Sequence, residues 1–415
     1  MSLLRMQGGL PLEGSVRLQR SKNAVLPMLA AAVMARGEVI LEDCPALSDV
    51  ENMLRILRRL GCAARRQGRD IHIAPGDGQI WEIPEELSGL LRSSVFLLGP
   101  IIARCGRAEA AYPGGCEIGL RPIDLHLKGL RALGVEIAEE HGRIRCRAER
   151  LQGASVALDF PSVGATENVM MAACLAKGTT TICNAAMEPE IEDLAGLLRC
   201  MGARIRGAGS PTIEIEGVSE LRGARYRPMP DRIAAGTFMA ATAAAGGHVR
   251  IEGARAQDLR AVIEKFREAG CEVVEEEGAV TIGRTGPLKP FTISTRPYPG
   301  FPTDLQSPFL ALACLARGTS TVEENLFENR FGAAAQLRRM GAEIALHDRT
   351  ALIRGGRLTG ARVCAGDLRA GAALVAAGLA AEGCSEIEGV ERIERGYEHL
   401  EEDLAALGAK IRRVD

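Results

Sequence analysis

The chain has 415 residues, about three times the usual length of one domain, so it is long enough for one to three domains, each with its own core. The 51 basic and 53 acidic side chains nearly balance, and aromatic residues make up only 3%. A net charge of −2 lacks the electrostatic footprint of a nucleic-acid-binding protein, and so few aromatic residues exclude a base-stacking platform.

No segment of the sequence predicts a membrane span. Residues 1–14 contain neither a long apolar run nor a cleavage signal, and the longest apolar stretches, such as residues 24–35, are shorter than the ~20 residues that cross a bilayer. The twelve cysteines are scattered singly, without a CxxC pair. We therefore expect a reduced, cytoplasmic protein whose cysteines are mostly small core residues.

An internal repeat is the strongest signal of architecture. Large apolar residues or Ala precede a glycine that recurs at intervals of 67 to 73 residues, at Gly61, Gly134, Gly202, Gly270, Gly341 and Gly408. A second glycine precedes each of these by 23 to 28 residues, at Gly37, Gly106, Gly178, Gly247, Gly318 and Gly383. The chain is therefore predicted to contain six copies of one structural unit.

The third copy shows the predicted elements of a unit. Residues 164–177 are apolar on nearly every side, which indicates a buried helix that stops at Gly178. Residues 179–182 favour a strand. Residues 189–201 open with Pro and acids and keep their leucines on one face, which predicts an amphipathic helix. Two further strands are expected at 203–209 and 212–217.

Apolar helices must avoid water, so three units should gather them at a centre and place their sheets outside. Six units then give an α/β protein of two domains. We place the break at the proline-rich residues 226–230, with one domain at 20–229 and the other at 1–19 plus 230–415. Residues 1–19 have no partner in the first unit, and we expect them to complete the last one.

Three short segments carry possible chemistry. Lys22, in the run Ser21-Lys22-Asn23, precedes the first buried helix, where a fixed cation and free backbone N–H groups suit an anion, although a solvated lysine fits the same position. Cys116 lies in a loop with three glycines and two prolines, near Arg121, a setting that fits an exposed reactive thiol and a cysteine without a function equally well. Asp304 precedes another buried helix, where a capping acid is the simplest interpretation.

The six-unit layout and these motifs resemble the enolpyruvyl transferases over essentially the whole chain. The resemblance implies two inside-out α/β barrel domains, each built from three βαβαββ-type repeats, with the active site in the cleft between them. It implies substrate contacts by residues of both domains: Lys22, Asn23, Arg92, Arg121, Pro122, Ile123, Asp124, Leu125, Ser162, Val163, Gly164, Arg232, Asp304, Leu326, Arg330, Arg369 and Arg395. Glu188 and Glu190 match acids near that cleft. Without the resemblance, each arginine also fits a solvated surface charge.

The resemblance also implies roles in catalysis. Cys116 would be a general acid on a lid loop and can form a covalent adduct with phosphoenolpyruvate, so the sequence leaves acid and nucleophile open. Asp304 would be the general base, and Lys22 and Arg395 would hold phosphoenolpyruvate. The chemistry needs no metal or other cofactor. The sequence departs from the family at Arg20 and at Ala234, the latter in place of an acid.

The loop around Cys116 and the run Arg121–Leu125 favour UDP-N-acetylglucosamine as the acceptor of the enolpyruvyl group. The resemblance then implies the first committed step of peptidoglycan precursor synthesis, hence cell wall biogenesis, cell shape, cell cycle and cell division, and it implies a target for fosfomycin. Two alternatives stay open. One is the branch of the family that forms 5-enolpyruvylshikimate 3-phosphate, and the other is a weakly catalytic paralogue that binds the sugar nucleotide as a sensor.

Overall fold

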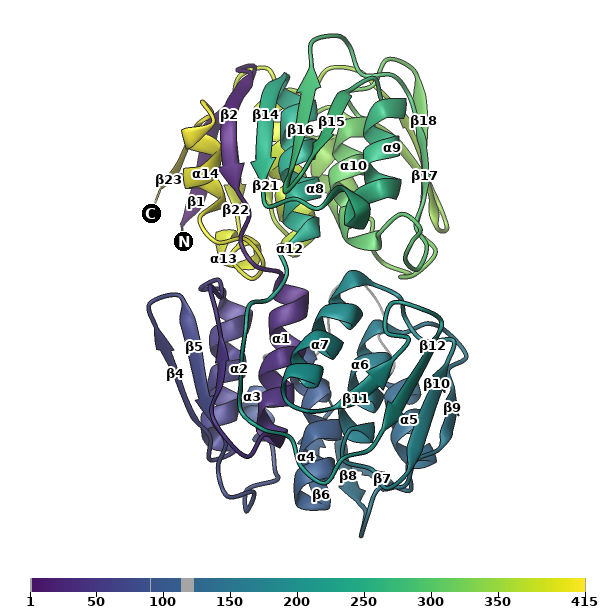
Figure 1. The fold of residues 1–415 in the computed structure, drawn as a ribbon. Coiled ribbons are helices and arrows are strands. Elements are labelled where there is room, and N and C mark those ends of the chain that lie inside the picture. Colours follow the sequence, from purple (N-terminus) through teal and green to yellow (C-terminus); the bar gives the residue numbers. More distant parts are fainter. Residues whose placement is uncertain (1, 90, 113–122, 415) are drawn as a thin grey trace. The chain divides into compact units, whose positions relative to one another are not determined.

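The computed structural model describes residues 2–89, 91–112 and 123–414, which form two compact units (Figure 1). The N-terminal unit lies within residues 20–229, and the C-terminal unit contains residues 2–19 and 230–414. The chain passes from one unit to the other after Gln19 and after Met229. Within the described residues, no helix is both long and apolar enough to cross a membrane.

The described part of the N-terminal unit alternates helices with short strands. In chain order its elements are α1 (Lys22–Ala31), η1 (Ala32–Met34), β3 (Val39–Leu41), α2 (Ser48–Arg59), β4 (Ala63–Gln67), β5 (Asp70–Ala74), α3 (Glu85–Ser88), η2 (Arg92–Leu97), α4 (Leu98–Cys105), β6 (Arg107–Ala111), α5 (Asp124–Ala132), β7 (Glu136–Glu140), β8 (Arg143–Arg147), β9 (Ser155–Ala157), α6 (Val163–Ala173), β10 (Thr179–Cys183), α7 (Pro189–Cys200), β11 (Arg204–Arg206), β12 (Thr212–Glu216) and β13 (Ala224–Tyr226).

The C-terminal unit has the same alternation and adds two N-terminal strands. Its elements are β1 (Leu3–Gln7), β2 (Leu12–Arg17), α8 (Arg232–Ala245), β14 (Gly247–Glu252), η3 (Ala256–Leu259), α9 (Arg260–Glu268), β15 (Glu272–Glu276), β16 (Ala279–Arg284), β17 (Thr292–Ser294), η4 (Thr303–Leu305), α10 (Gln306–Ala313), β18 (Thr319–Glu323), α11 (Gly332–Arg339), β19 (Glu343–His347), β20 (Thr350–Arg354), β21 (Arg362–Cys364), α12 (Leu368–Ala380), β22 (Cys384–Glu388), α13 (Val390–Ile393), α14 (Leu400–Ala406) and β23 (Lys410–Val414).

All six sheets share one strand pattern, as expected of a repeat. Five have four strands, in the orders β13-β3-β5-β4, β11-β12-β10-β9, β15-β16-β14-β2, β17-β18-β20-β19 and β21-β22-β1-β23. Each of these combines one parallel edge pair with two antiparallel pairs. The sixth, β6-β8-β7, keeps the two antiparallel pairs, and a single parallel bridge from Glu82 to Glu109 stands where the fourth strand would be.

Residues 3–17 complete two sheets of the C-terminal unit. Strand β1 lies between β22 and β23 and is antiparallel to both, so that Leu3 pairs with Glu388 and with Val414. Strand β2 pairs in parallel with β14. Without β1 the last sheet would lose its central connection, because β22 and β23 reach each other only through it.

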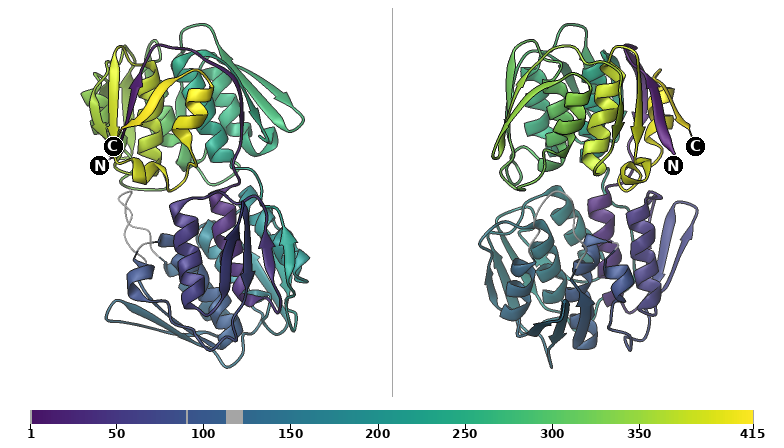
Figure 2. Two further views of the ribbon diagram at one scale, coloured as in Figure 1. Left: turned by 90° about the vertical axis from the view of Figure 1, so that its left-hand side faces the viewer. Right: turned by 180° about the vertical axis from the view of Figure 1, so that it is seen from behind.

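The apolar helices form the core of each unit and the sheets lie outside, which confirms the predicted fold class (Figure 2). In the C-terminal unit, α8, α10 and α12 pack against one another. In the N-terminal unit, α6 packs against α4 and α5. The three sheets of a unit are separate, so each barrel is a ring of sheets around helices rather than one closed sheet.

The third repeat agrees with its prediction except at one helix end. The predicted helix 164–177 is α6, which ends at Ala173, four residues early. The N–H groups of Cys174, Leu175 and Ala176 bond to carbonyls three residues back, so the apolar run ends in a tighter turn before Gly178.

The recurring glycine has a conformational reason. All six of the later glycines have φ between 81° and 104°, and each follows the end of an amphipathic helix by one or two residues. Because this left-handed backbone conformation is costly for residues with a Cβ atom, glycine is the residue that ends these helices and turns the chain into a strand.

Candidate active site

The predicted site residues gather at helix starts. Six central helical segments begin at or within two residues of one of them: α1 at Lys22, η2 at Arg92, α6 at Val163, α8 at Arg232, η4 beside Asp304 and α12 beside Arg369. The first N–H groups of a helix lack intrahelical partners and carry partial positive charge, so this placement suits anionic ligands.

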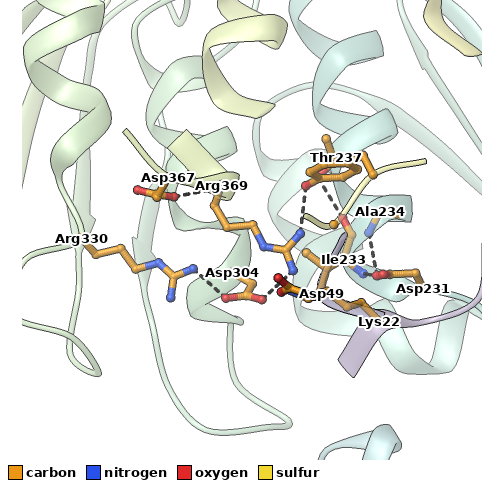
Figure 3. A network of polar contacts seen from close by, with 12 residues as sticks. Lys22, Asp49, Asp231, Ile233, Ala234, Thr237, Asp304, Arg330, Asp367 and Arg369 are labelled. Atoms are coloured by element: carbon orange, nitrogen blue, oxygen red, sulfur yellow. Dashed lines mark hydrogen bonds and ion pairs between the residues drawn. The ribbon is translucent and has the colours of Figure 1, made fainter. Parts of the chain in front are cut away.

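Asp304 is held between two buried arginines of the C-terminal unit (Figure 3). Arg330 Nη2 donates to its Oδ1 at 2.6 Å, and Arg369 Nη2 donates to its Oδ2 at 2.8 Å. Both arginines are only 4% exposed, whereas the Asp304 side chain is 26% exposed. The acid does not cap α10, whose preceding residue, Leu305, makes no side-chain cap. The capping interpretation was therefore wrong, and the carboxylate is oriented by two cations.

Tyr397 anchors the far side of the Arg369 guanidinium. Arg369 Nη1 donates to Tyr397 Oη at 3.1 Å, and that oxygen lies 2.8 Å from Thr237 Oγ1 on α8. Thr237 in turn donates to the carbonyl of Ile233 at 3.0 Å. Burial would lower the pKa of Arg369, but the negative charge of Asp304 and the contact with Tyr397 raise it above its usual value. Arg369 is therefore a permanently charged, fixed group.

Aspartates cap the two helices that start with predicted arginines. Asp231 Oδ1 accepts from the N–H groups of Ile233 and Ala234, and Asp367 Oδ1 accepts from those of Arg369 and Ala370. These caps hold the first turns of α8 and α12, from which the arginines extend.

Arg232 is 9% exposed and its guanidinium lies 5.6 Å from the centre of the Tyr298 ring. Burial of Arg232, Arg330 and Arg369 excludes the alternative interpretation of these three residues as solvated surface charges. The departure at Ala234 leaves a buried residue whose N–H the cap of α8 satisfies.

Gln19 fixes the segment that carries Arg395. Its Nε2 donates to the carbonyl of Gly396 at 2.9 Å, and its Oε1 accepts from the N–H of Glu398 at 2.9 Å. Arg395 is half-buried and follows α13. Gln19, the last residue before the chain first passes to the N-terminal unit, therefore fixes the backbone on both sides of Tyr397.

In the N-terminal unit, Lys22 forms an ion pair with Asp49. Its Nζ lies 3.1 Å from Oδ2 of Asp49 in the first turn of α2, and the two side chains are 12% and 4% exposed. Lys22 is therefore not a solvated surface lysine. Its neighbour Asn23 is half-buried in the first turn of α1.

The unusual Arg20 belongs to a different charge cluster. Its Nε lies 3.1 Å from Asp43, which also binds Arg69 and Arg227. Partial burial would raise the pKa of Asp43, but the hydrogen bonds from Arg69 and Arg227 and the charge of Arg20 lower it to about 2. This departure from the family thus has an acidic partner in Asp43.

Two more predicted substrate segments lie at the starts of α6 and α5. Ser162 caps α6 by accepting from the N–H of Ala165, and Val163 and Gly164 form the first turn. A side chain at position 164 would lie within 2.8 Å of Phe96 and 2.9 Å of His126, so only glycine fits there.

At the start of α5, Ile123 is buried, and Asp124 and Leu125 form the first turn. Cys116, Arg121 and Pro122 lie outside the described residues. Arg92 begins the 3₁₀ segment η2, which leads into α4. The α-helix starts at Leu98 because Pro100, which lacks an N–H, fits its first turn.

The cysteines that recur between repeats are core residues. Cys174 and Cys314 end α6 and α10, and Cys62 and Cys271 follow the later glycine of their repeats; all four are buried. Burial raises the pKa of the thiols of Cys174 and Cys314 to about 12. These thiols are poor nucleophiles, which agrees with their interpretation as packing residues.

Three acids meet inside the N-terminal unit. Glu190 and Glu167 are 2% and 1% exposed, and Glu188 precedes α7. Burial, with the charges of Glu190 and Glu188, raises the pKa of Glu167 well above its usual range. Across the described residues, no group of three or more His, Cys, Asp and Glu side chains is arranged to hold a metal ion.

Sequence reasoning missed the partners that hold these residues. Asp49 lies on an amphipathic helix with other acids, and nothing in the sequence distinguishes it. Tyr397 lies two residues after Arg395 and is one of just four tyrosines, but no motif in the sequence links it to Arg369. Gln19 was missed because its two bonds join residues nearly 380 positions apart.

Comparison with known proteins identifies the family. Residues 6–404 match the family described as EPSP synthase (3-phosphoshikimate 1-carboxyvinyltransferase). The match covers nearly the whole chain, and the protein therefore belongs to this family of enolpyruvyl transferases, which confirms the predicted family and the prediction of a transferase.

Two curated relatives refine this placement. The chain is 50% identical, over 97% of both sequences, to UDP-N-acetylglucosamine 1-carboxyvinyltransferase 1 of Caldanaerobacter subterraneus subsp. tengcongensis. It is 49% identical, over the full length of both, to UDP-N-acetylglucosamine 1-carboxyvinyltransferase of Oleidesulfovibrio alaskensis.

Solved structures share the fold. The enolpyruvyl transferase NikO from Streptomyces tendae has a TM-score of 0.89 and 27% identity, covering 100% of this chain and 99% of its own. EPSP synthase from Acinetobacter baumannii has a TM-score of 0.77 with 19% identity over the full length of both, and supports the fold alone.

Proposed function

We propose that this enzyme transfers the enolpyruvyl group of phosphoenolpyruvate to the 3′-hydroxyl of UDP-N-acetylglucosamine and releases phosphate. The acceptor follows from the relatives named for it, which are 49–50% identical over almost the full chain. The observation that carries the chemistry is Asp304, a partly exposed carboxylate oriented by two buried guanidinium groups at a helix start.

Phosphoenolpyruvate is small and highly anionic, so its binding needs fixed cations. We assign this role to Lys22, Arg121, Arg369 and Arg395. Arg369 is already charged and fixed by Tyr397 and Asp304. A bound anion would compete with Asp304 for the arginines, which would release the carboxylate to accept a proton from the sugar hydroxyl.

The proposed reaction is addition followed by elimination. The 3′-oxygen attacks C2 of phosphoenolpyruvate while Asp304 accepts the hydroxyl proton and Cys116 donates a proton to C3. The C2–O bond to phosphate then breaks, and loss of one proton from C3 restores the double bond. Alternatively, Cys116 acts as a nucleophile: its sulfur bonds to C2, the C2–C3 double bond becomes a single bond, and C3 takes up the proton that the thiol loses, which gives a covalent adduct.

The residues proposed for this reaction come from both units, so we propose that both bind one pair of substrates and that sugar-nucleotide binding closes the enzyme. We expect the radius of gyration from small-angle scattering to fall when UDP-N-acetylglucosamine is added. An unchanged radius would argue against closure.

The test of the function is phosphate release from phosphoenolpyruvate with each acceptor in turn. We expect release with UDP-N-acetylglucosamine and none with shikimate 3-phosphate. The reverse result would assign the protein to the shikimate branch. Binding of the sugar nucleotide without release would indicate a sensor, an alternative motivated by Arg20 and Ala234, although Arg20 has its own acidic partner.

The proposed reaction would place the enzyme at the first committed step of peptidoglycan precursor synthesis, in the cytoplasm, where it would support cell wall growth and division. Alkylation of Cys116 by fosfomycin would then inhibit it. Both statements depend on the acceptor assignment tested above.

A further inference from the structure

Glu324 is a fully buried acid that the proposed reaction does not use. It follows β18, is 0% exposed, and makes four hydrogen bonds within the C-terminal unit. Oε1 accepts from Thr295 Oγ1 at 2.9 Å and from the N–H groups of Leu326 at 2.9 Å and Phe327 at 3.2 Å. Oε2 accepts from Thr303 Oγ1 at 2.9 Å. A buried carboxylate is costly unless it is bonded in this way, so its presence calls for a structural reason.

The four bonds join two loops that both reach Asp304. Thr303 is the residue before Asp304 in η4. Phe327, on the other loop, packs its ring 5.2 Å from the guanidinium of Arg330, which donates to Asp304 Oδ1. The contacts therefore form a closed ring from Glu324 through Thr303, Asp304, Arg330 and Phe327 back to Glu324.

We propose that Glu324 is a positioning residue for Asp304. Its carboxylate fixes the position of the Asp304 turn through the hydrogen bond from Thr303. It fixes the position of the loop that carries Arg330 through the hydrogen bonds from the N–H groups of Leu326 and Phe327. A carboxylate can accept several hydrogen bonds at once, whereas a backbone amide or hydroxyl offers fewer acceptor sites, which explains why an acid occupies this position. The inference rests on the proposed function, since it gives Asp304 the role of base.

Two threonines donate to the Glu324 carboxylate, but only Thr303 belongs to the ring of contacts that includes Asp304. Thr303 connects Glu324 to the Asp304 turn, whereas Thr295 lies after β17 and connects Glu324 to the adjacent strand of the same sheet. Thr295 Oγ1 also accepts from the N–H of Asn325, so its loss removes two hydrogen bonds where loss of the Thr303 hydroxyl removes one. If Glu324 only stabilised the fold, loss of the Thr295 hydroxyl would lower kcat at least as much as loss of the Thr303 hydroxyl.

The test compares Thr303→Val, Thr303→Ser and Thr295→Val by phosphate release and thermal unfolding. Because misplacing a catalytic group by about 1 Å can cost on the order of 100-fold in rate, we expect Thr303→Val to lower kcat at least tenfold, with KM for phosphoenolpyruvate changed less than about twofold. Thr303→Ser keeps the hydroxyl and should restore kcat to within about twofold. Thr295→Val should lower the melting temperature at least as much as Thr303→Val but lower kcat by less than about threefold.

Wild-type kcat in Thr303→Val, or an equal loss of kcat in Thr303→Ser or Thr295→Val, would overturn the positioning role while leaving the proposed reaction intact. A wild-type enzyme that releases no phosphate would instead overturn the proposed function, and this inference with it. If Thr303→Val does not fold, Thr303→Ala, which adds no bulk, takes its place with the same expected loss of kcat.

Discussion

The two units use the same helix starts in different ways. In the C-terminal unit, Asp304, Arg330 and Arg369 form one connected network that continues through Tyr397 to Thr237. In the N-terminal unit, the predicted cation Lys22 pairs with Asp49, and Arg20 pairs with Asp43.

The difference shows what a repeat can and cannot supply. The repeat gives both units buried helices with open N–H groups at their starts, which attract anions whatever side chains follow. The side chains then specialise each unit. The network of the C-terminal unit orients the carboxylate that we propose as the base, whereas the ion pair with Asp49 holds the Lys22 ammonium at the start of α1, where we propose that it binds a substrate anion.

Asp304→Asn should have the largest effect. Because general base catalysis contributes roughly 100- to 10,000-fold, we expect phosphate release to fall about 1,000-fold. Calorimetry should still detect binding of UDP-N-acetylglucosamine. Turnover within tenfold of wild type would show that the network in the C-terminal unit has only a structural role.

Replacement of Cys116 should have the next largest effect. We expect Cys116→Ser to lower turnover about 100-fold, within the usual range for a general acid, and to change inhibition by fosfomycin. The matched control is Cys174→Ser, because the Cys174 thiol is buried and bonds to the carbonyl of Met170. The control should change the melting temperature but not turnover. Equal behaviour of the two variants would refute the role of Cys116.

Lys22→Gln tests the ion pair between Lys22 and Asp49 in the N-terminal unit. Since truncation of one partner in a buried charged contact costs about 2–5 kcal/mol, we expect KM for phosphoenolpyruvate to rise at least about 30-fold. Arg20→Gln removes a nearby cation that pairs with Asp43 and should leave KM within about twofold. A similar rise in both variants would mean that overall charge, not the position of Lys22, sets binding.

The smallest expected effects concern the pH dependence of stability. Ionisation of one acid in the N-terminal unit, Asp43, stabilises the fold, whereas ionisation of one acid in the C-terminal unit, Asp403, destabilises it. The pKa of Asp43 is lowered to about 2, so its contribution to stability is present above about pH 4 and is lost as the pH falls toward 2. Burial raises the pKa of Asp403, in α14, to about 6. Its ionisation therefore costs stability as the pH rises from about 4 to 6.

We accordingly expect Asp43→Asn to lower and Asp403→Asn to raise the melting temperature at pH 7, each by a few degrees, and both differences to shrink at acid pH. Thermal unfolding between pH 3 and 7 measures this. Differences independent of pH would show that neither effect comes from ionisation.

The sequence by itself determined the repeated part of the fold. The glycines that end the amphipathic helices must adopt a left-handed conformation, and the apolar helices cannot face water, so both features are visible in the residues themselves. For the same reason the helix starts at Lys22, Ser162 and Asp304 were predictable as places where chemistry gathers.

Only the tertiary structure decided which side chains meet there. Three sets of contacts show this: the ion pair of Lys22 with Asp49, the hydrogen bonds of Gln19 to the backbone around Tyr397, and the ring that joins Glu324 to Asp304. They connect residues that are distant in sequence or that lie on loops without a periodic pattern. Hydrogen bonds and ion pairs depend on distances of a few tenths of an ångström, which local propensity does not encode. The packing of helices and sheets sets those distances, and with them the orientation of the one carboxylate on which the proposed reaction depends.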